Sequence, residues 1–190
     1  MGDIHTGSRD LHYKPVTRQT IVDLLRLMEK HRTFASCACM RCRLRPARFE
    51  ALSSRRRREA MQGLVERGSI VGILAYRIDT PVAWCSVAPR ESFAALPASH
   101  SRAPAEDTAV WTVTCFWVTP ALRRRGIASA LLRAAVEYAR THGARMVEGY
   151  PVPAGHPDQR MGSPDIFRRA GFRDVTSEGR RRRVMRNVVG

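Results

Sequence analysis

Apolar residues recur along the chain with two periods, of two residues and of about 3.6 residues, and these periods predict strands and helices. The expected strands, rich in β-branched and aromatic residues, cover residues 11–16, 70–77, 80–88, 110–118, 144–150, 172–175 and 184–189. The expected helical segments are 21–31, 46–67, a helix that begins between residues 125 and 128 and runs to Arg140, and 164–170. This order predicts an α/β fold with a mixed, mostly antiparallel sheet flanked by helices.

The length of 190 residues fits one domain with a sizeable core. We expect that domain to span residues 11–190, after a polar and flexible N-terminus at residues 1–10. Asp79-Thr80-Pro81 is a plausible hairpin turn between two of the strands. Residues 89–104 are expected to cross the surface, with a short helix at 92–96.

The strand expected at Val110–Val118 is mostly apolar on both faces, which indicates a central position in the sheet. Strict alternation places residues 112, 114, 116 and 118 on one face and residues 111, 113, 115 and 117 on the other. The sequence Arg123-Arg-Arg-Gly-Ile-Ala128 then leads into a helix, whose first N–H groups have no partner within the helix. Small residues and arginines here predict an anion-binding turn. The alternative is a solvated arginine run before a helix.

Two motifs carry a family resemblance. Arg123-x-x-Gly126-x-Ala128 resembles the Q/R-x-x-G-x-G/A signature of the GNAT N-acetyltransferase superfamily, and Ile166 to Phe172 resembles the xYxxxGF end of a later helix. The resemblance covers roughly residues 11–188 and implies a single-domain GNAT fold that transfers acetyl groups from acetyl-CoA, its co-substrate, to an amine. It implies that acetyl-CoA is bound by Val118, Arg123, Arg124, Arg125, Gly126, Ile127, Ala128 and Ser129.

The acid and base that many GNAT enzymes use are absent from the matching positions. Phe167 stands where a tyrosine protonates the leaving thiolate, and Thr112 stands where some relatives carry a glutamate. We therefore predict Glu148 as a base acting through water and Tyr150 as an acid. The alternatives are a surface strand residue for Glu148 and an aromatic ring packed under the Pro-rich loop for Tyr150. Cys115 is a further candidate acid. The alternative is that its thiol is buried and unreactive.

Three cysteines have C-x-C-x-x-C spacing at Cys37, Cys39 and Cys42. Cys37-Ala-Cys-Met40, with Trp84-Cys-Ser-Val-Ala-Pro-Arg90, is similar to an uncharacterised GNAT subgroup. The cysteines have three interpretations: thiols packed beneath the substrate side, a redox-sensitive group near arginines, or a structural metal. A zinc site needs a fourth ligand, and no second cysteine pair is present, so we expect no metal. Cys85 and Cys115 are most simply small core residues.

The formal net charge is +16, and all but Lys14 and Lys30 of the 33 basic residues are arginines. A GC-rich genome would produce this bias toward arginine. The positive electrostatic field of the chain also attracts polyanions and opposes a polycationic acceptor such as a polyamine. Arg55–Arg58 is either a solvated helix face or part of a basic wall around an acidic or phosphate-bearing acceptor.

The expected function is therefore N-acetylation of a small-molecule amine. The alternatives are acetylation of a macromolecule, with nucleic acid as a partner, or a non-catalytic acyl-CoA-binding module. No apolar run approaches the ~20 residues of a membrane span, and the N-terminus lacks an apolar signal core. A cytoplasmic location without membrane contact is expected. A monomer and a homodimer both fit.

Overall fold

The computed structural model describes residues 11–96, 109–153, 155–156, 159–178 and 182–189. The predicted flexible N-terminus at 1–10 and the second half of the predicted surface crossing, 97–104, lie outside the described residues. The strands form one seven-stranded sheet in the order β1-β2-β3-β4-β5-β7-β6, in which only the β4–β5 pair is parallel. The predicted α/β fold with a mixed, mostly antiparallel sheet is confirmed.

The elements follow the predicted order, with more helices than expected before the second strand. The strands are β1 (Leu11–Pro15), β2 (Ile73–Arg77), β3 (Thr80–Pro89), β4 (Val110–Val118), β5 (Met146–Gly149), β6 (Arg173–Asp174) and β7 (Met185–Val188). The α-helices are α1 (Ile21–Glu29), α2 (Arg32–Cys37), α3 (Pro46–Ala51), α4 (Ser54–Glu66), α5 (Ile127–Thr141) and α6 (Pro164–Arg169). Three short 3₁₀ helices are η1 (Arg90–Ser92), η2 (Pro120–Leu122) and η3 (Gln159–Met161).

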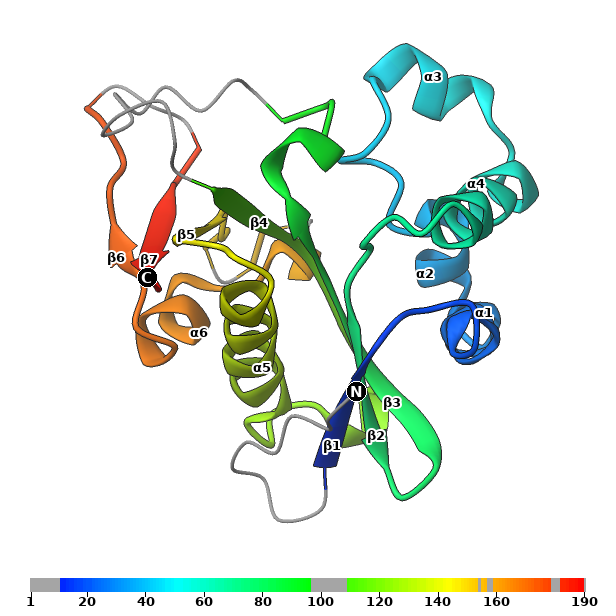
Figure 1. Cartoon of the computed structure of the whole chain (residues 1–190), viewed down its shortest axis with the longest axis horizontal. Helices are drawn as coiled ribbons and strands as arrows, with labels where there is room; N and C mark the ends of the chain where they lie inside the picture. Colours follow the sequence, from blue (N-terminus) through cyan, green and yellow to red (C-terminus); the bar gives the residue numbers. More distant parts are fainter. Residues whose placement is uncertain (1–10, 97–108, 154, 157–158, 179–181, 190) are drawn as a thin grey trace.

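Helices cover both faces of the sheet (Figure 1). On one face, α5 and α6 pack on a core that includes Val113, Leu131 and Phe167. On the other face, α1, α2, α3 and α4 enclose a second core that includes Phe34 and Trp84. Burial on both faces explains why the central strands carry almost continuous apolar sequence.

The predicted alternation along β4 is wrong beyond Val113. Val113 pairs with Val87 and Cys115 pairs with Ser86, so Thr114 is an extra residue that bulges out of the ladder with β3. Trp111 and Val113 face α5, and after the bulge Phe116 faces the same side, whereas Cys115 and Trp117 join the opposite core. The bulge therefore turns Cys115 and Trp117 toward α2.

The predicted helical region at 46–67 is two helices, because α3 ends at Ala51 and Ser53 caps α4, its side chain accepting a hydrogen bond from the Arg56 N–H. Residues 32–37, expected as loop, form α2, which buries Phe34 against Trp117. The turn between β2 and β3 is made by residues 78–79, and Thr80 belongs to β3. The short helix expected at 92–96 is wrong: the described residues contain a 3₁₀ helix at 90–92, η1, and residues 93–96 are not helical.

In the described part of the chain, no helix combines the length and the apolar character needed to cross a bilayer.

Candidate active site

Strands β4 and β5 separate at the bulge. Their pairing runs from Val110–Met146 to Val113–Gly149, where β5 ends, but β4 continues to Val118. The edge of β4 from Cys115 to Val118 therefore has no strand partner on that side among the described residues. An unpaired edge offers backbone N–H and C=O groups to a ligand that carries amides.

The turn after β4 presents backbone N–H groups. Arg124 and Gly126 adopt left-handed conformations, with φ of 62° and 77°. The N–H of Ala130 donates to the carbonyl of Gly126 at 3.0 Å, so the N–H groups of residues 127–129 precede the helical ladder of α5. They carry partial positive charge at the helix N-terminus. This geometry suits a bound anion.

The arginines of the turn are exposed, and Arg123 ties the turn to the strand. Its Nε donates to the carbonyl oxygen of Val118 at 3.0 Å, and its guanidinium lies 5.1 Å from the ring centre of Trp117. Ile127 is buried, so its contribution to this surface comes from its backbone. All eight residues predicted to bind acetyl-CoA thus lie on one continuous segment beside the unpaired edge of β4.

This segment fits an acyl-CoA in two independent ways. Pantetheine carries amide groups that can pair with the free edge of β4, and the pyrophosphate is an anion of the kind that a helix N-terminus and arginines bind. No Cβ built on Gly126 would meet an atom within 4 Å, so the backbone at this position is open.

The sequence profile of the Acetyltransferase (GNAT) family matches residues 32–161. The chain belongs to the GNAT acetyltransferase family. The protein is accordingly an acyltransferase whose co-substrate is acetyl-CoA. No curated protein matches the sequence significantly.

Solved structures share the fold at low sequence identity. RimL, a ribosomal L7/L12 alpha-N-protein acetyltransferase in complex with coenzyme A, aligns with a TM-score of 0.58 and 15% identity, over 99% of this chain and 98% of its own. PaiA N-acetyltransferase from Thermoplasma acidophilum, also with coenzyme A, aligns with a TM-score of 0.56 and 10% identity, over 94% and 98%. A longer GCN5-related N-acetyltransferase from Kribbella flavida is covered over 33% of its length, with 87% of this chain aligned, 19% identity and a TM-score of 0.47.

The two predicted catalytic residues of this GNAT protein contact each other. The Tyr150 hydroxyl donates a hydrogen bond to a carboxylate oxygen of Glu148. The other oxygen of Glu148 accepts hydrogen bonds from Arg186 at 2.9 and 2.8 Å, and the Nε of Arg90 lies 3.8 Å from the first oxygen. Burial and the hydrogen bond to Glu148 raise the pKa of Tyr150 above its usual range. Glu148 is 1% exposed, which differs from the surface strand residue considered as its alternative.

Phe167 has a packing role. Its ring is fully buried and packs edge-on against Phe116 and Phe172. A Cβ on Gly149 would lie 2.1 Å from the Phe167 ring, so the ring fills the space beside the end of β5. Thr112 is also buried, and its hydroxyl has no hydrogen-bond partner among the described residues.

A cavity lies on the opposite face of the sheet, between α2, α3, α4 and the end of β4. We call it the arginine cavity; it has a volume of about 420 Å³ and is lined by Thr33, Ser36, Cys37, Arg41, Phe49, Arg57, Trp117 and Arg160. Of the arginine run in α4, Arg57 alone lines this cavity, and its guanidinium donates to the carbonyls of Ser36 and Phe49. Arg55 and Arg56 pair with Glu59 on the surface.

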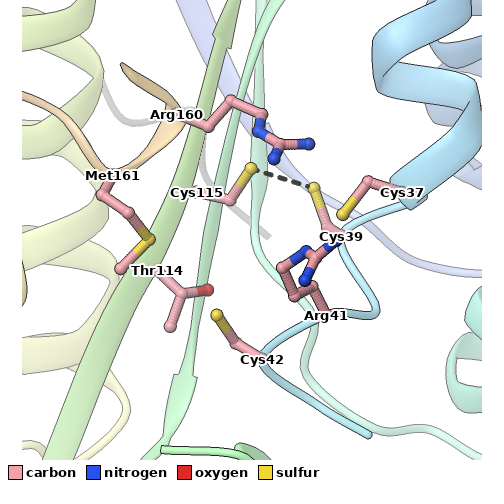
Figure 2. Close-up of a pocket in the computed structure, with 8 residues that line it drawn as sticks. All are labelled: Cys37, Cys39, Arg41, Cys42, Thr114, Cys115, Arg160 and Met161. Carbon is pink, nitrogen blue, oxygen red and sulfur yellow. Dashed lines mark hydrogen bonds between the residues drawn. The ribbon is translucent and has the colours of Figure 1, made fainter. Parts of the chain in front are cut away.

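A smaller cavity at the bulge contains four of the five cysteines. We call it the thiol cavity; it is lined by Cys37, Cys39, Arg41, Cys42, Thr114, Cys115, Arg160 and Met161 (Figure 2). The Thr114 hydroxyl is buried and has no hydrogen-bond partner among the described residues. A third cavity, of about 530 Å³, shares Arg41, Cys42 and Met161 with the thiol cavity and is lined by Tyr150 as well. The thiol cavity thus shares lining residues with both larger cavities, and Arg41 lines all three; we call these three neighbouring cavities together the trough.

Several residues of this trough could not be recognised from sequence. Arg41 lies within the C-x-C-x-x-C segment, but nothing in that spacing predicts that it lines a cavity with Arg160, a single arginine in a segment without a motif. Arg186 reaches Glu148 from a strand 38 positions away. The C-x-C-x-x-C spacing did mark Cys37, Cys39 and Cys42 as a candidate site, and the structure places Cys115 beside them. In the described part of the chain, no group of three or more His, Cys, Asp or Glu side chains is arranged to hold a metal ion.

Proposed function

We propose that the protein transfers the acetyl group of acetyl-CoA directly to the amine of a small molecule that also carries a carboxylate or phosphate. The arginine cavity carries this proposal, because its lining contains Arg41, Arg57 and Arg160 and, among the described residues, no carboxylate. Its volume of about 420 Å³ lies in the range of small-molecule sites. Guanidinium groups bind planar anions through paired hydrogen bonds.

The position of the cavity also supports the proposal. The arginine cavity and the thiol cavity share Cys37, Arg41 and Arg160, and the thiol cavity reaches Thr114 and Cys115 on β4. An acceptor anchored at the arginines would extend its amine toward the free edge of β4, where we place the thioester. Holding both reactants in this way supplies most of what acetyl transfer requires.

The roles of individual residues follow as proposals. The N–H of Val118 stabilises the developing oxyanion, and residues 123–129 hold the pyrophosphate. Tyr150 donates a proton to the leaving thiolate; its raised pKa keeps the phenol protonated at neutral pH, although it also makes the phenol a weaker acid. Glu148 is occupied by Arg186, Arg90 and Tyr150, which favours a role in orienting the phenol over the predicted role as a base.

The experiment is an assay of acetyl-CoA consumption and acetylated product with matched pairs of amines. Each pair shares a carbon skeleton, and one member carries a carboxylate or phosphate. We expect the anionic member to have the higher kcat/KM, and a polyamine to be a poor acceptor. Faster reaction with the uncharged members would contradict the proposed acceptor class. No product with any amine would select a non-catalytic acyl-CoA-binding module.

A macromolecular acceptor is the second candidate. Exposed arginines at positions 45, 48, 55 and 56 lie on α3, α4 and the segment before them, beside the arginine cavity. Such a surface attracts RNA and acidic proteins. Aminoacyl-tRNA and protein N-terminal peptides therefore belong in the same assay, and reaction with these alone would select this candidate.

We also propose that the protein works in a reducing compartment such as the cytoplasm. None of the five cysteines, all of which lie in the described part of the chain, is in a disulfide, and Cys39 and Cys115 are within hydrogen-bond distance of each other. Thiols in this arrangement persist where glutathione and thioredoxin keep them reduced.

A further inference from the structure

Two cysteines that are 76 positions apart in sequence meet in the thiol cavity. The Sγ atoms of Cys39 and Cys115 lie 3.2 Å apart, and Figure 2 shows them facing each other with Arg160 beside the pair. The indole Nε1 of Trp84 donates a hydrogen bond to Cys39 Sγ at 3.1 Å. Both cysteines are almost fully buried, at 4% and 8% exposure. The pair therefore joins the turn after α2 to β4, with Trp84 on β3 in contact with Cys39.

The backbone of the turn is strained where it presents Cys39. Ala38 and Cys39 both adopt left-handed conformations, with φ of 46° and 53°. Two consecutive residues other than glycine in this region cost free energy, and such strain persists where the surroundings impose it, often at functional sites.

A buried cation lies next to this pair. Arg43 is 7% exposed, and its guanidinium donates to the Val71 carbonyl at 2.9 Å and to Ser86 Oγ at 3.4 Å. No carboxylate in the described part of the chain pairs with it, and its Nε has no hydrogen-bond partner there. Burial lowers the pKa of Arg43 to about 10, and the thiols of Cys39 and Cys42 oppose that shift. A thiolate would supply the negative charge that this buried guanidinium lacks.

Of the two sulfur atoms, Cys39 is the better anion. Burial raises its pKa, but hydrogen bonds with Cys115 and Trp84 and the charges of Arg43 and Arg160 outweigh burial and lower it. The pKa of Cys115 is raised well above its usual range by the hydrogen bond with Cys39 and by burial. Cys115 therefore holds its proton more tightly than Cys39.

The cavity limits what can reach the pair. The thiol cavity has a volume of about 20 Å³, which is room for about one water. Hydrogen peroxide is close to water in size, whereas an aromatic disulfide reagent or glutathione disulfide is far larger.

We propose that Cys39 and Cys115 form a peroxide-reactive thiolate–thiol pair that closes to a disulfide. In the first step the Cys39 thiolate attacks one oxygen of hydrogen peroxide, the O–O bond breaks, and Cys39 sulfenic acid and hydroxide form. In the second step Cys115 sulfur attacks the sulfenic sulfur, and its proton leaves with the hydroxyl as water. The two thiols are oxidised by two electrons and the peroxide is reduced. A disulfide needs the sulfur atoms to approach by about 1 Å.

Peptide mapping of the full-length protein after hydrogen peroxide treatment tests the proposal directly. We expect a Cys39–Cys115 disulfide, with loss of two hydrogen atoms, that dithiothreitol reverses. In Cys115→Ser we expect Cys39 sulfenic acid, detected as the gain of one oxygen atom on the Cys39 peptide or trapped by dimedone added together with denaturant. Oxidation that spares both residues, or that stops at Cys39 sulfenic acid in the unaltered protein, would overturn the proposal. These readouts need no acetyl transfer, so they stand apart from the proposed function.

Two matched variants separate this chemistry from general cysteine oxidation. Cys85→Ser removes another buried thiol, whose pKa burial raises well above its usual range, and should leave the disulfide yield unchanged. Trp84→Phe removes the N–H donor to Cys39 and should slow peroxide oxidation severalfold. An aromatic disulfide reagent should label Cys42, which is half-buried, before Cys39. Equal labelling of Cys39 and Cys42, or peroxide oxidation of Trp84→Phe at the rate of the unaltered protein, would contradict a buried Cys39 thiolate in the thiol cavity.

Discussion

Tyr150 donates its hydroxyl hydrogen bond to Glu148, a carboxylate that is buried and fixed by Arg186. If Tyr150 protonates the leaving thiolate, Tyr150→Phe lowers kcat by roughly 100-fold or more and leaves the affinity for acetyl-CoA unchanged. Tyr138→Phe is the matched control, because Tyr138 lies on α5 against Trp111 and His142. Steady-state kinetics and calorimetry measure both quantities. Equal kcat in the two variants would remove Tyr150 from the chemistry.

All four tyrosines should stay protonated in the folded protein at a pH where free tyrosine ionises. Burial raises the pKa of Tyr13, Tyr76, Tyr138 and Tyr150. A pKa raised on folding adds stability below the unfolded value of about 10, and this stability is lost as the pH rises through the folded values. Phenolate absorbance should therefore rise near pH 10 in denaturant but later in buffer. A rise near pH 10 with native circular dichroism would contradict this burial.

Glu148 also has a structural role that can be measured separately. Glu148→Gln removes the buried negative charge that contacts the half-buried guanidinium groups of Arg186 and Arg90. Breaking a buried ion pair from one side destabilises a protein by about 3–5 kcal/mol. Urea unfolding should show a loss of this order. Glu59→Gln, which removes an exposed partner of Arg55 and Arg56, should leave the free energy of unfolding nearly unchanged. Equal losses would mean that the buried network contributes no stability.

The order of strands and helices along the chain was predictable from sequence because each segment carries its own hydrophobic pattern. The bulge at Thr114 was not, since it arises from the register between Ser86 and Val87 on the neighbouring strand. A single extra residue then reverses the faces of Cys115 and Trp117. Alternation within β4 contains no information about its partner.

Short helices and contacts between distant residues could not be predicted from the sequence, for related reasons. Helix α2 has six residues, too few to show helical periodicity, and Phe34 stacked on Trp117 anchors it. The contacts of Glu148 with Arg186 and of Cys39 with Cys115 join residues far apart in the chain. The anion-binding turn was recognisable because strand, glycine and helix are adjacent in sequence. Whether its residues bind acetyl-CoA stays a prediction.

Arg41 should govern acceptor affinity, because it lines all three cavities of the trough. We expect Arg41→Gln to raise KM for an anionic acceptor by about tenfold or more, as for loss of a charged hydrogen bond. KM for acetyl-CoA should not change. Arg55→Gln is the control, since Arg55 lies in the same basic region with 83% of its side chain exposed. If both variants raise KM equally, long-range charge rather than the cavity determines acceptor binding.

The central claim is that the turn at Arg123–Ser129 holds the pyrophosphate of acetyl-CoA. Gly126→Glu places a negative charge there, and Gly143→Glu is its matched control at the other end of α5. Both glycines have left-handed φ, 77° and 86°, and a Cβ at either would meet no atom within 4 Å, so the backbone strain is comparable. Isothermal titration with acetyl-CoA should show binding to the unaltered protein and Gly143→Glu, and no binding to Gly126→Glu. Equal affinity in the two variants would contradict the account.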